Sequence, residues 1–284
     1  MLDVYKSFYK LESQPFRLSP DYRFTFGHRT YDEAMAYLKY SISEGEGFVA
    51  ITGAPGTGKT TLIETLLTDI DDSLIKVATL TNTALDTRVL VERVLDAYGM
   101  HPGNLTNVNP LALLIQFLRK QSQRGGRTVL IVDEAQTLAE SALEELRILS
   151  NLQHNNQLLL QILLVGQESL MDVIRSPGME QLQQRLIAAS RLEPLELDDT
   201  RAYIDYRLHK VGWKEDPSFS DETIGLIHKF SGGVPRRINL ICNRLFLRGG
   251  IENKHEFHGK DALTVIVELH KEGLLPSAAS SALA

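Results

Sequence analysis

The sequence predicts an α/β fold in which a parallel sheet is covered on both faces by helices and is followed by a small all-helical domain. Three observations lead to this prediction. Short apolar segments alternate with amphipathic helical segments up to about residue 197, a glycine-rich turn joins one apolar segment to a helix, and only helical patterns follow residue 197. The 284 residues are enough for two domains of ordinary size.

The composition is that of a folded protein with a substantial apolar core. Hydrophobic residues make up 43% of the chain and charged residues 23%, which excludes a chain that is disordered throughout. The formal net charge of −6 is unfavourable for binding nucleic acid by electrostatics alone. The single cysteine, Cys242, excludes an internal disulfide bond and a cysteine-rich zinc site, and we expect it to be buried in a helix.

The sequence contains no apolar run of the length, about 18 residues, that a membrane-spanning helix requires. The longest candidate, residues 158–165, is short and is interrupted by Gln161. The N-terminus lacks the apolar core and the small-residue cleavage site of a signal peptide. We therefore expect a cytoplasmic protein that reaches the inner membrane, if at all, through a partner.

Residues 1–30 form an aromatic-rich N-terminal segment that we expect to pack on the core, because a mobile tail would lack so many aromatic side chains. Pro15 and Pro20 predict turns within it. Its aromatic residues are Tyr5, Phe8, Tyr9, Phe16, Tyr22, Phe24 and Phe26.

The α/β domain is expected to occupy residues 31–197. A helical pattern begins at Thr30 and ends at Gly45 and Gly47, and a helix also follows the glycine-rich turn, through Leu67. Three further helices are predicted at 87–98, 111–121 and 141–149. Strands are predicted at 48–52, 75–80, 128–132, 159–165 and 191–195.

The helical domain is expected to occupy residues 198–275. Asp198 or Asp199 is a candidate N-cap for its first helix, and further helices are predicted at 221–230, 234–247 and 259–270. The small, polar residues 276–284 are expected to be a disordered tail.

The strongest chemical signal is a complete phosphate-binding loop, the Walker A motif, between a predicted strand and a predicted helix. Glycines let backbone N–H groups converge on a polyphosphate, and the helix N-terminus adds a positive dipole. Lys59 would bridge the β- and γ-phosphates, and the Thr60 hydroxyl would ligate Mg²⁺. A glycine turn without a ligand is the alternative. The predicted nucleotide-binding residues are Gly53, Ala54, Pro55, Gly56, Thr57, Gly58, Lys59, Thr60 and Thr61.

Asp133 and Glu134 follow the apolar strand 129–132, as in a Walker B motif, at the end where open α/β sheets bind ligands. Asp133 would hold the magnesium ion, through water. Glu134 would polarise the attacking water, which is the role that separates a hydrolase from a nucleotide switch. In the alternative, both carboxylates only cap the next turn. No metal other than magnesium is expected.

Three further polar residues are catalytic candidates with structural alternatives. Gln167 ends a strand, where its side chain could reach the γ-phosphate, or it is an exposed loop residue. Arg236 opens a helix and could reach back over the nucleotide, or it is a solvated helix start. Arg185 could neutralise charge at the γ-phosphate of a neighbouring subunit, or it forms a surface ion pair.

The chain resembles the AAA+ ATPases and, more narrowly, two related families: the ATPase domain of general secretion pathway protein A, and the secretion ATPases of exosortase/PEP-CTERM exopolysaccharide loci. The resemblance covers nearly the whole chain and lies in the order of its motifs. These are Phe8-Tyr9, Pro15-Phe16, Ser19-Pro20-Asp21, Ala34-Met35-Ala36-Tyr37-Leu38, Gly45-Glu46-Gly47-Phe48, Asp133-Glu134-Ala135-Gln136, Leu149-Ser150-Asn151, Leu164-Val165-Gly166-Gln167, Gln184-Arg185, Thr200-Arg201-Ala202-Tyr203-Ile204, and Gly232-Gly233-Val234-Pro235-Arg236-Arg237-Ile238-Asn239.

The resemblance implies an ATPase with ATP and Mg²⁺ as cofactors, a three-layer P-loop NTPase domain and a helical lid. It assigns Gln167 as the first sensor, Arg185 as the finger acting in trans and Arg236 as the lid sensor, in a homo-oligomer. Secretion protein A continues into a membrane helix and a peptidoglycan-binding region, whereas this chain stops shortly after the lid. Any envelope role is therefore expected to pass through a partner.

Three functions remain open at this point. The first is an ATPase that energises or regulates an envelope secretion or exopolysaccharide export system. The second is a transposition-type, DNA-associated ATPase. Two observations disfavour it: the net charge is negative, and the basic residues form only one modest cluster, at Arg119, Lys120, Arg124 and Arg127. The third is a nucleotide-gated assembly scaffold with little turnover.

Overall fold

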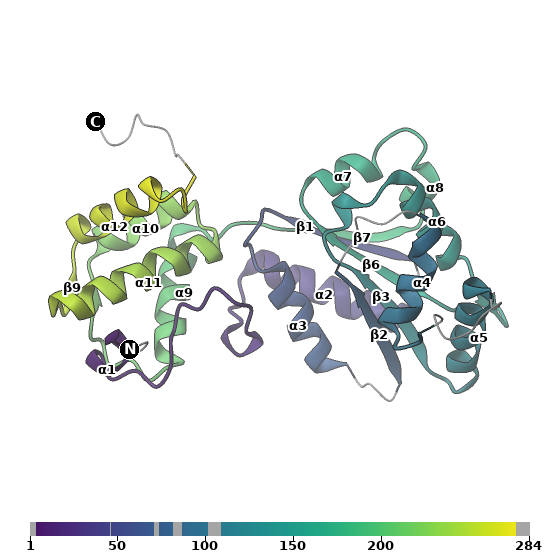
Figure 1. Cartoon of the computed structure of the whole chain (residues 1–284), viewed down its shortest axis with the longest axis horizontal. Coiled ribbons are helices and arrows are strands. Elements are labelled where there is room, and N and C mark those ends of the chain that lie inside the picture. The colour runs from purple at the N-terminus through teal and green to yellow at the C-terminus, as the bar shows by residue number, and fades with distance from the viewer. Residues whose placement is uncertain (1–3, 46, 71–73, 82–86, 102–108, 277–284) are drawn as a thin grey trace. The chain divides into compact units, whose positions relative to one another are not determined.

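A computed structural model describes residues 4–45, 47–70, 74–81, 87–101 and 109–276 (Figure 1). The expected disordered tail, apart from Pro276, lies outside these residues. The chain divides into two compact units: an α/β unit made of residues 29–55 and 62–192, and a helical unit made of residues 1–28, 56–61 and 193–284. The helical unit thus includes the N-terminal segment and resumes at Glu193, shortly before the boundary expected from the sequence.

The α/β unit is built on a five-stranded parallel sheet with the order β2-β3-β6-β1-β7. Its strands are β1 (Phe48–Gly53), β2 (Ile75–Leu80), β3 (Arg127–Val132), β6 (Gln161–Gly166) and β7 (Leu186–Leu192). The central strand β6 pairs with both β1 and β3, so that Leu164 lies between Ala50 and Val132. Because all pairs are parallel, the carboxyl ends of β1, β3 and β6 lie at one edge of the sheet.

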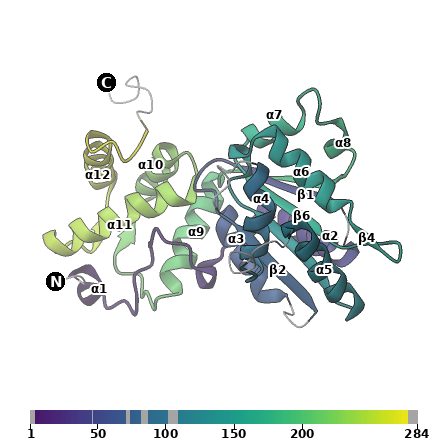
Figure 2. The same cartoon turned by 45° about the vertical axis from the view of Figure 1, so that its right-hand side comes forward.

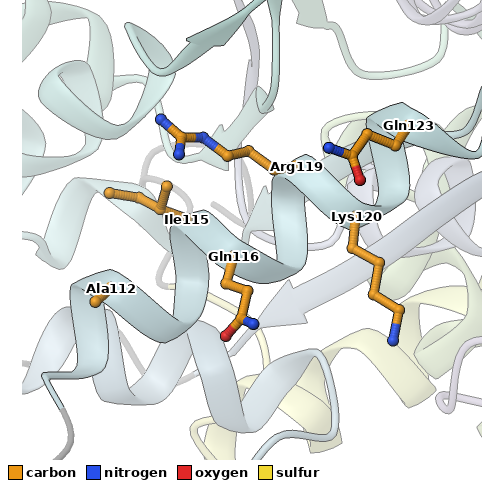
Figure 3. Close-up of a pocket in the computed structure, with 6 residues that line it drawn as sticks. All are labelled: Ala112, Ile115, Gln116, Arg119, Lys120 and Gln123. Atoms are coloured by element: carbon orange, nitrogen blue, oxygen red, sulfur yellow. The ribbon is translucent and has the colours of Figure 1, made fainter.

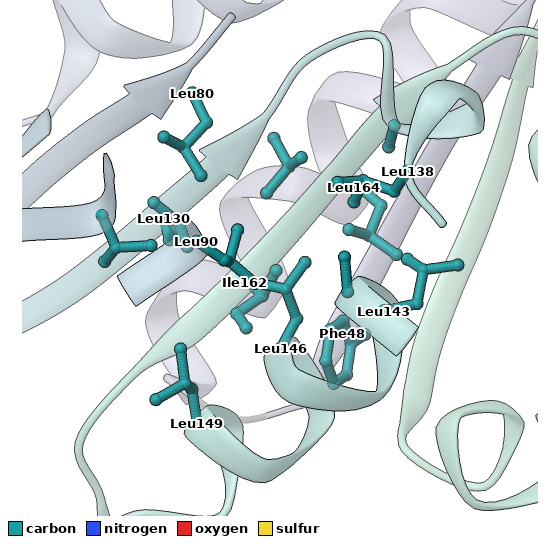
Figure 4. Packing of buried hydrophobic residues seen from close by; sticks show 14 of the residues in the cluster. Phe48, Leu80, Leu90, Leu130, Leu138, Leu143, Leu146, Leu149, Ile162 and Leu164 are labelled. Carbon is teal, nitrogen blue, oxygen red and sulfur yellow. The ribbon is translucent and has the colours of Figure 1, made fainter. Parts of the chain in front are cut away.

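Alternate residues of these strands form two apolar layers, one on each face of the sheet. One layer contains Phe48, Leu130 and Ile162 and packs against α4 (Thr87–Ala97), α5 (Pro110–Gln123) and α6 (Glu140–Ser150) (Figure 4). Leu90, Leu114 and Leu146, one from each of these helices, are completely buried there.

The opposite layer contains the neighbouring residues in each strand, Val49, Ile131 and Leu163. It packs against α2 (Arg29–Glu44) and α3 (Lys59–Asp69) through Leu38 and Leu62. Figure 1 shows α2 and α3 on one side of the sheet and α4–α6 on the other, and Figure 2 gives a second view of the same elements. The predicted parallel sheet covered on both faces is therefore confirmed.

The prediction for the last strand was wrong. It was expected at 191–195, but β7 spans Leu186–Leu192. Within the described part of the chain this is an outer strand of the sheet, paired with β1 alone, and its residues before Leu192 are exposed or half-buried. An edge strand built of Ala188, Ala189 and Ser190 lacks the continuous apolar run by which a buried strand is recognised. Five short elements among the described residues of the α/β unit were also missed: η3 (Ala135–Thr137), β4 (Gln153–His154), β5 (Gln157–Leu158), α7 (Ser169–Ile174) and α8 (Glu180–Gln183).

The helical unit contains α9 (Leu197–His209), α10 (Asp221–Ser231), α11 (Pro235–Glu252) and α12 (Gly259–Lys271). It is not entirely helical, because β8 (Ser218–Phe219) pairs with β9 (Glu256–Phe257) in a short parallel ladder. The N-cap of α9 is Glu196, so Asp198 and Asp199 lie in the first helical turn, where they favour the helix dipole instead of capping it. Cys242 is completely buried on α11, and burial raises the pKa of its thiol.

The N-terminal segment packs against the helices of this unit. It contains α1 (Val4–Phe8) and a 3₁₀ turn, η1 (Tyr22–Phe24). Tyr5, Tyr9 and Phe16 belong to the same apolar cluster as α9–α12, and the ring centroid of each lies within 6 Å of that of Phe246. The sequence predicted that this segment packs, but did not indicate which surface would receive it.

Polar contacts hold the same segment in place. Arg207 on α9 is buried, its Nε donates to the Pro15 carbonyl oxygen at 2.7 Å, and its guanidinium lies 4.9 Å from the centroid of the Phe24 ring. Asn239 on α11 donates to the Arg17 carbonyl oxygen at 3.2 Å. A buried arginine requires partners of this kind, because its charge cannot be neutralised by loss of a proton.

Among the described residues, none of the helices combines the length and the apolar character that crossing a membrane requires.

We expect Phe16→Ala to lower the free energy of unfolding of the helical unit by about 3 kcal/mol or more, because it leaves a cavity beside Phe246. Chemical denaturation followed by tyrosine and Trp213 fluorescence measures this loss. The exposed Leu18 provides the control, since Leu18→Ala removes an apolar side chain of the same segment from the surface. Equal losses for the two variants would contradict the packing described here.

Candidate nucleotide-binding site

The predicted phosphate loop leaves the carboxyl end of β1 and leads directly into α3, which begins at Lys59. Gly56 and Gly58 have φ values of +88° and +103°, a conformation that L-residues with side chains rarely adopt. Thr57 and Lys59 are 2% and 8% exposed, so the loop is packed and not a free surface turn. The loop thus has the backbone form in which successive N–H groups converge at a helix N-terminus.

The start of α11 lies against this loop within the helical unit. The Arg236 N–H donates to the Gly56 carbonyl oxygen at 3.2 Å. A Cβ atom on Gly56 would lie 2.7 Å from the Arg236 Cβ, so only glycine permits this approach. The side chain of Arg236 is exposed. The predicted lid sensor is therefore next to the phosphate loop, while the role of its guanidinium remains a prediction.

The two predicted carboxylates follow β3 directly. The Asp133 N–H donates to the Leu80 carbonyl oxygen of β2, and the Glu134 N–H donates to Asp133 Oδ1 at 2.9 Å. Glu134 has φ +52° and ψ +36°, a left-handed conformation that is costly for a residue with a side chain. Such strain persists only where the surroundings impose it, and it is concentrated at functional sites.

A 3₁₀ turn, η3 (Ala135–Thr137), imposes this conformation. Its first residue, Ala135, and the residue that follows it, Leu138, are buried in the apolar layer of α4–α6. The Thr137 N–H and Oγ1 both donate to the Glu134 carbonyl oxygen, at 2.9 and 2.8 Å. The backbone of Glu134 is thus held by a turn that is anchored in the core.

Gln136 links Glu134 to the end of the neighbouring strand β6. Its Nε2 donates to Glu134 Oε2 at 2.6 Å, and its Oε1 accepts a hydrogen bond from the Gln167 N–H at 2.9 Å. Gly166 makes room for this amide, since a Cβ at that position would lie 2.6 Å from Gln136 Oε1. Gln136 stands in the Asp133-Glu134-Ala135-Gln136 motif, but no role was predicted for it from the sequence. Its position two residues after Glu134 was the available signal.

Gln167 lies directly after β6 at the same edge of the sheet as Asp133 and Glu134, and its carbonyl oxygen accepts the N–H of Leu170 at the start of α7. The structure therefore brings Gln167 close to Glu134 through Gln136. The contact that involves Gln167 is made by its backbone, and the predicted role of its side chain remains a prediction.

Arg185 lies at the amino ends of the strands, opposite to the edge that carries Asp133, Glu134 and Gln167. It precedes β7, and its carbonyl oxygen accepts the N–H of Phe48, the first residue of β1, at 2.8 Å. The length of β1 separates this position from the phosphate loop, since β7 and β1 run parallel. Arg185 is therefore not grouped with Asp133, Glu134 and Gln167 within the α/β unit.

The basic residues noted in the sequence belong to two elements: Arg119, Lys120 and Arg124 to α5 and its C-cap, and Arg127 to β3. Arg127 begins β3, and its Nη1 donates to the carbonyl oxygens of Ile42 and Ser43. These carbonyl groups lie in the last turn of α2, where the helix itself offers no hydrogen-bond donor. Arg119 and Lys120 border a shallow hollow on α5 and extend from that helix in different directions (Figure 3). The hollow is lined by residues of this one helix: Ala112, Ile115, Gln116, Arg119, Lys120 and Gln123.

Comparison with known proteins agrees with this geometry. Residues 42–174 match the family described as AAA domain. General secretion pathway protein A of Aeromonas hydrophila is 35% identical to 99% of the chain. The chain spans about half, 52%, of the length of that relative.

Two solved structures share the fold at low sequence identity. The ORC2 protein of Aeropyrum pernix in its ADPNP–ADP complexes superposes with a TM-score of 0.63 and 14% identity, over 88% of this chain and 72% of that one. The ORC1 protein of Aeropyrum pernix in complex with DNA superposes with a TM-score of 0.67 and 15% identity, over 93% and 71%.

The chain therefore has the α/β fold of the AAA+ P-loop NTPases, matches the AAA domain family over residues 42–174, and resembles general secretion pathway protein A.

Proposed function

We propose that this protein binds Mg-ATP at the carboxyl ends of β1 and β3 and hydrolyses it. The observation that carries the proposal is that the glycine-rich loop and the left-handed Glu134 leave two strands of one parallel sheet at the same edge. Ligands of open α/β sheets bind at this edge.

The residues present fit a magnesium–nucleotide complex. The loop amides and the N-terminus of the 11-residue helix α3 suit a polyphosphate, and Lys59 supplies a point charge for the β- and γ-phosphates. Oxygen ligands suit Mg²⁺, which Thr60 would bind directly and Asp133 through water. When bound, the metal neutralises charge that develops on the phosphates.

Glu134 is the proposed general base, which accepts a proton from the attacking water. Gln167 would orient that water and contact the γ-phosphate, and Arg236 would sense the nucleotide from the helical unit, which we propose acts as a lid. The backbone contact between Arg236 and Gly56 supports that assignment. The other residues of the segment Gly53–Thr61, besides Lys59 and Thr60, would surround the phosphates.

We assign Arg185 to the site of a neighbouring copy in a homo-oligomer. Arg185 lies at the amino end of β7, whereas the phosphate loop of the same chain follows the carboxyl end of β1. This separation supports action in trans. An arginine that enters a neighbour's site stabilises the transition state there and makes turnover depend on assembly.

We propose that the ATPase energises or regulates an envelope secretion or exopolysaccharide export system, through an envelope or membrane-associated partner at the cytoplasmic face of the inner membrane. The name of the relative in Aeromonas hydrophila, general secretion pathway protein A, supports the secretion part of this proposal. The alternative is a DNA-associated ATPase, which the complex of the ORC1 protein with DNA favours. The acidic net charge and the use of Arg127 to cap α2 argue against it.

Deletion of the gene, with complementation by wild type or Glu134→Gln, tests the biological role. Loss of secreted protein or polysaccharide that only the wild type restores supports it. ATP-dependent DNA binding that survives about 200 mM salt would favour the DNA-associated alternative, because purely electrostatic binding weakens steeply over that range.

Replacing the loop lysine should weaken nucleotide binding. We expect Lys59→Ala to raise the Kd for Mg-ATP about 10- to 100-fold, because a charge-assisted hydrogen bond to phosphate is lost. Isothermal titration calorimetry measures this change, and Lys39→Ala, on α2, is the matched control. Unchanged affinity in Lys59→Ala would contradict the assignment of the loop.

Glu134→Gln should separate binding from hydrolysis. We expect kcat to fall about 100-fold or more, because the amide cannot accept the proton, while the Kd for Mg-ATP changes less than about threefold. Phosphate release and equilibrium binding measure the two quantities. Full turnover in the variant would rule out Glu134 as the base, and a wild type that binds ATP without turnover would favour the assembly scaffold.

Arg185→Ala should lower kcat about 10³-fold without changing nucleotide affinity, because the finger acts on the transition state in a neighbouring copy. An equimolar mixture with Glu134→Gln should regain activity, since about a quarter of randomly formed interfaces would join an intact Arg185 to an intact Glu134. Each variant alone is the control. A mixture no more active than its components would argue against action in trans.

A further inference from the structure

Gln136, at the carboxyl ends of β3 and β6, is a polar residue to which the proposed function gives no role. Gln136 is half-buried, and each end of its amide is engaged. Nε2 donates to Glu134 Oε2 at 2.6 Å, and Oε1 accepts from the Gln167 N–H at 2.9 Å. The first bond reaches the carboxylate that would take up the proton, and the second reaches the backbone at the end of β6.

We propose that Gln136 is a positioning residue that sets the orientation of the Glu134 carboxylate and ties it to the position of Gln167; this inference rests on the proposed function. A carboxylate on a free side chain samples several rotamers, whereas a base must be held close to the proton that it accepts. The Nε2 bond restricts that freedom, while the turn η3 holds the backbone.

The amide of Gln136 is itself oriented. Its two ends differ chemically, because only the nitrogen can donate to Glu134 and only the oxygen can accept from the Gln167 N–H. Both bonds are therefore satisfied in one orientation of the amide, and flipping it would place its oxygen against the carboxylate. Gly166 provides the space, since a side chain there would meet Gln136 Oε1 at 2.6 Å.

This arrangement connects the base to a neighbouring strand. Gln167 follows β6 and begins the turn into α7, so a displacement of that backbone changes the position of the Gln136 oxygen. The same amide carries the nitrogen that holds Glu134. A shift at the end of β6, of the kind that contact with a phosphate would cause, is thereby passed to the carboxylate through two hydrogen bonds.

The first test is Gln136→Ala in the full chain. We expect kcat for Mg-ATP to fall about 10- to 100-fold, because misplacement of a catalytic group by about 1 Å has an effect of this size, while the Kd for Mg-ATP and the thermal midpoint remain close to those of the wild type. Gln116→Ala is the matched control, because Gln116 is an exposed residue of α5, away from the site. Its kcat should be unchanged.

Combining variants tests whether Gln136 acts through Glu134. In the Glu134→Gln background, Gln136→Ala should reduce the residual rate less than about threefold, because the group that it positions is already inactive. A further loss as large as in the wild-type background would overturn the proposal, since Gln136 would then act independently of Glu134.

Gln136→Glu supplies a second variant of nearly the same shape. The introduced carboxyl group can donate to Glu134 only when it is protonated, so the rate relative to wild type should rise as the pH falls from about 8 to about 6. A packing defect would not produce this pH dependence. A constant ratio would therefore contradict the positioning role.

The outcomes separate the inference from the proposed function. If the wild type hydrolyses ATP, Glu134→Gln lowers kcat as expected and Gln136→Ala keeps full kcat, the inference fails and the proposed function stands. A higher kcat in Gln136→Ala also overturns the inference, because Gln136 would then restrain Glu134. If the wild type neither binds nor hydrolyses ATP, the proposed function itself fails.

Discussion

The parallel pairing of β6 with both β1 and β3 is the constraint on which the rest of the α/β unit depends. It brings the carboxyl ends of three strands to one edge, although the residues that follow them are far apart in the chain. The pairing is held by two apolar layers, since a shift of one residue would exchange every side chain between the layers of α4–α6 and α2–α3. Core packing thus determines which polar groups meet at the site.

At that edge, polar groups are held by a short turn whose neighbouring apolar residues are buried in the core. Glu134 adopts a left-handed conformation because the turn that follows it is fixed by buried Ala135 and Leu138. Gln136 then extends from the same turn to Gln167. The strain at Glu134 is tolerated because the free energy of core burial exceeds it, and the result is a carboxylate whose backbone and side chain are both oriented.

The helical unit uses a different kind of stabilisation. Its apolar cluster is closed by aromatic residues of the N-terminal segment, and the buried Arg207 donates to backbone oxygen of that segment while lying against Phe24. Deletion of this segment would therefore expose Phe246 and leave Arg207 without these partners. The segment is a structural part of the unit that also carries α11, whose first turn contacts the phosphate loop.

Local pattern alone determined much of this protein. The alternation of apolar strands and amphipathic helices predicted the sheet with its two covered faces. The phosphate loop and the Asp133-Glu134 pair predicted the candidate site. Both predictions were possible because the spacing of apolar residues, the spacing of glycines and the position of carboxylates after a strand are properties of residues that are close in the sequence. The edge strand β7 and the surface that receives the N-terminal segment were not determined in this way. Tertiary structure also decided the contact of Gln136 with Gln167, which lies across a strand pairing, and the location of Arg185 at the opposite edge, which follows from the direction of β7. Those features depend on which distant segments pair, and that choice is made by packing of the whole sheet.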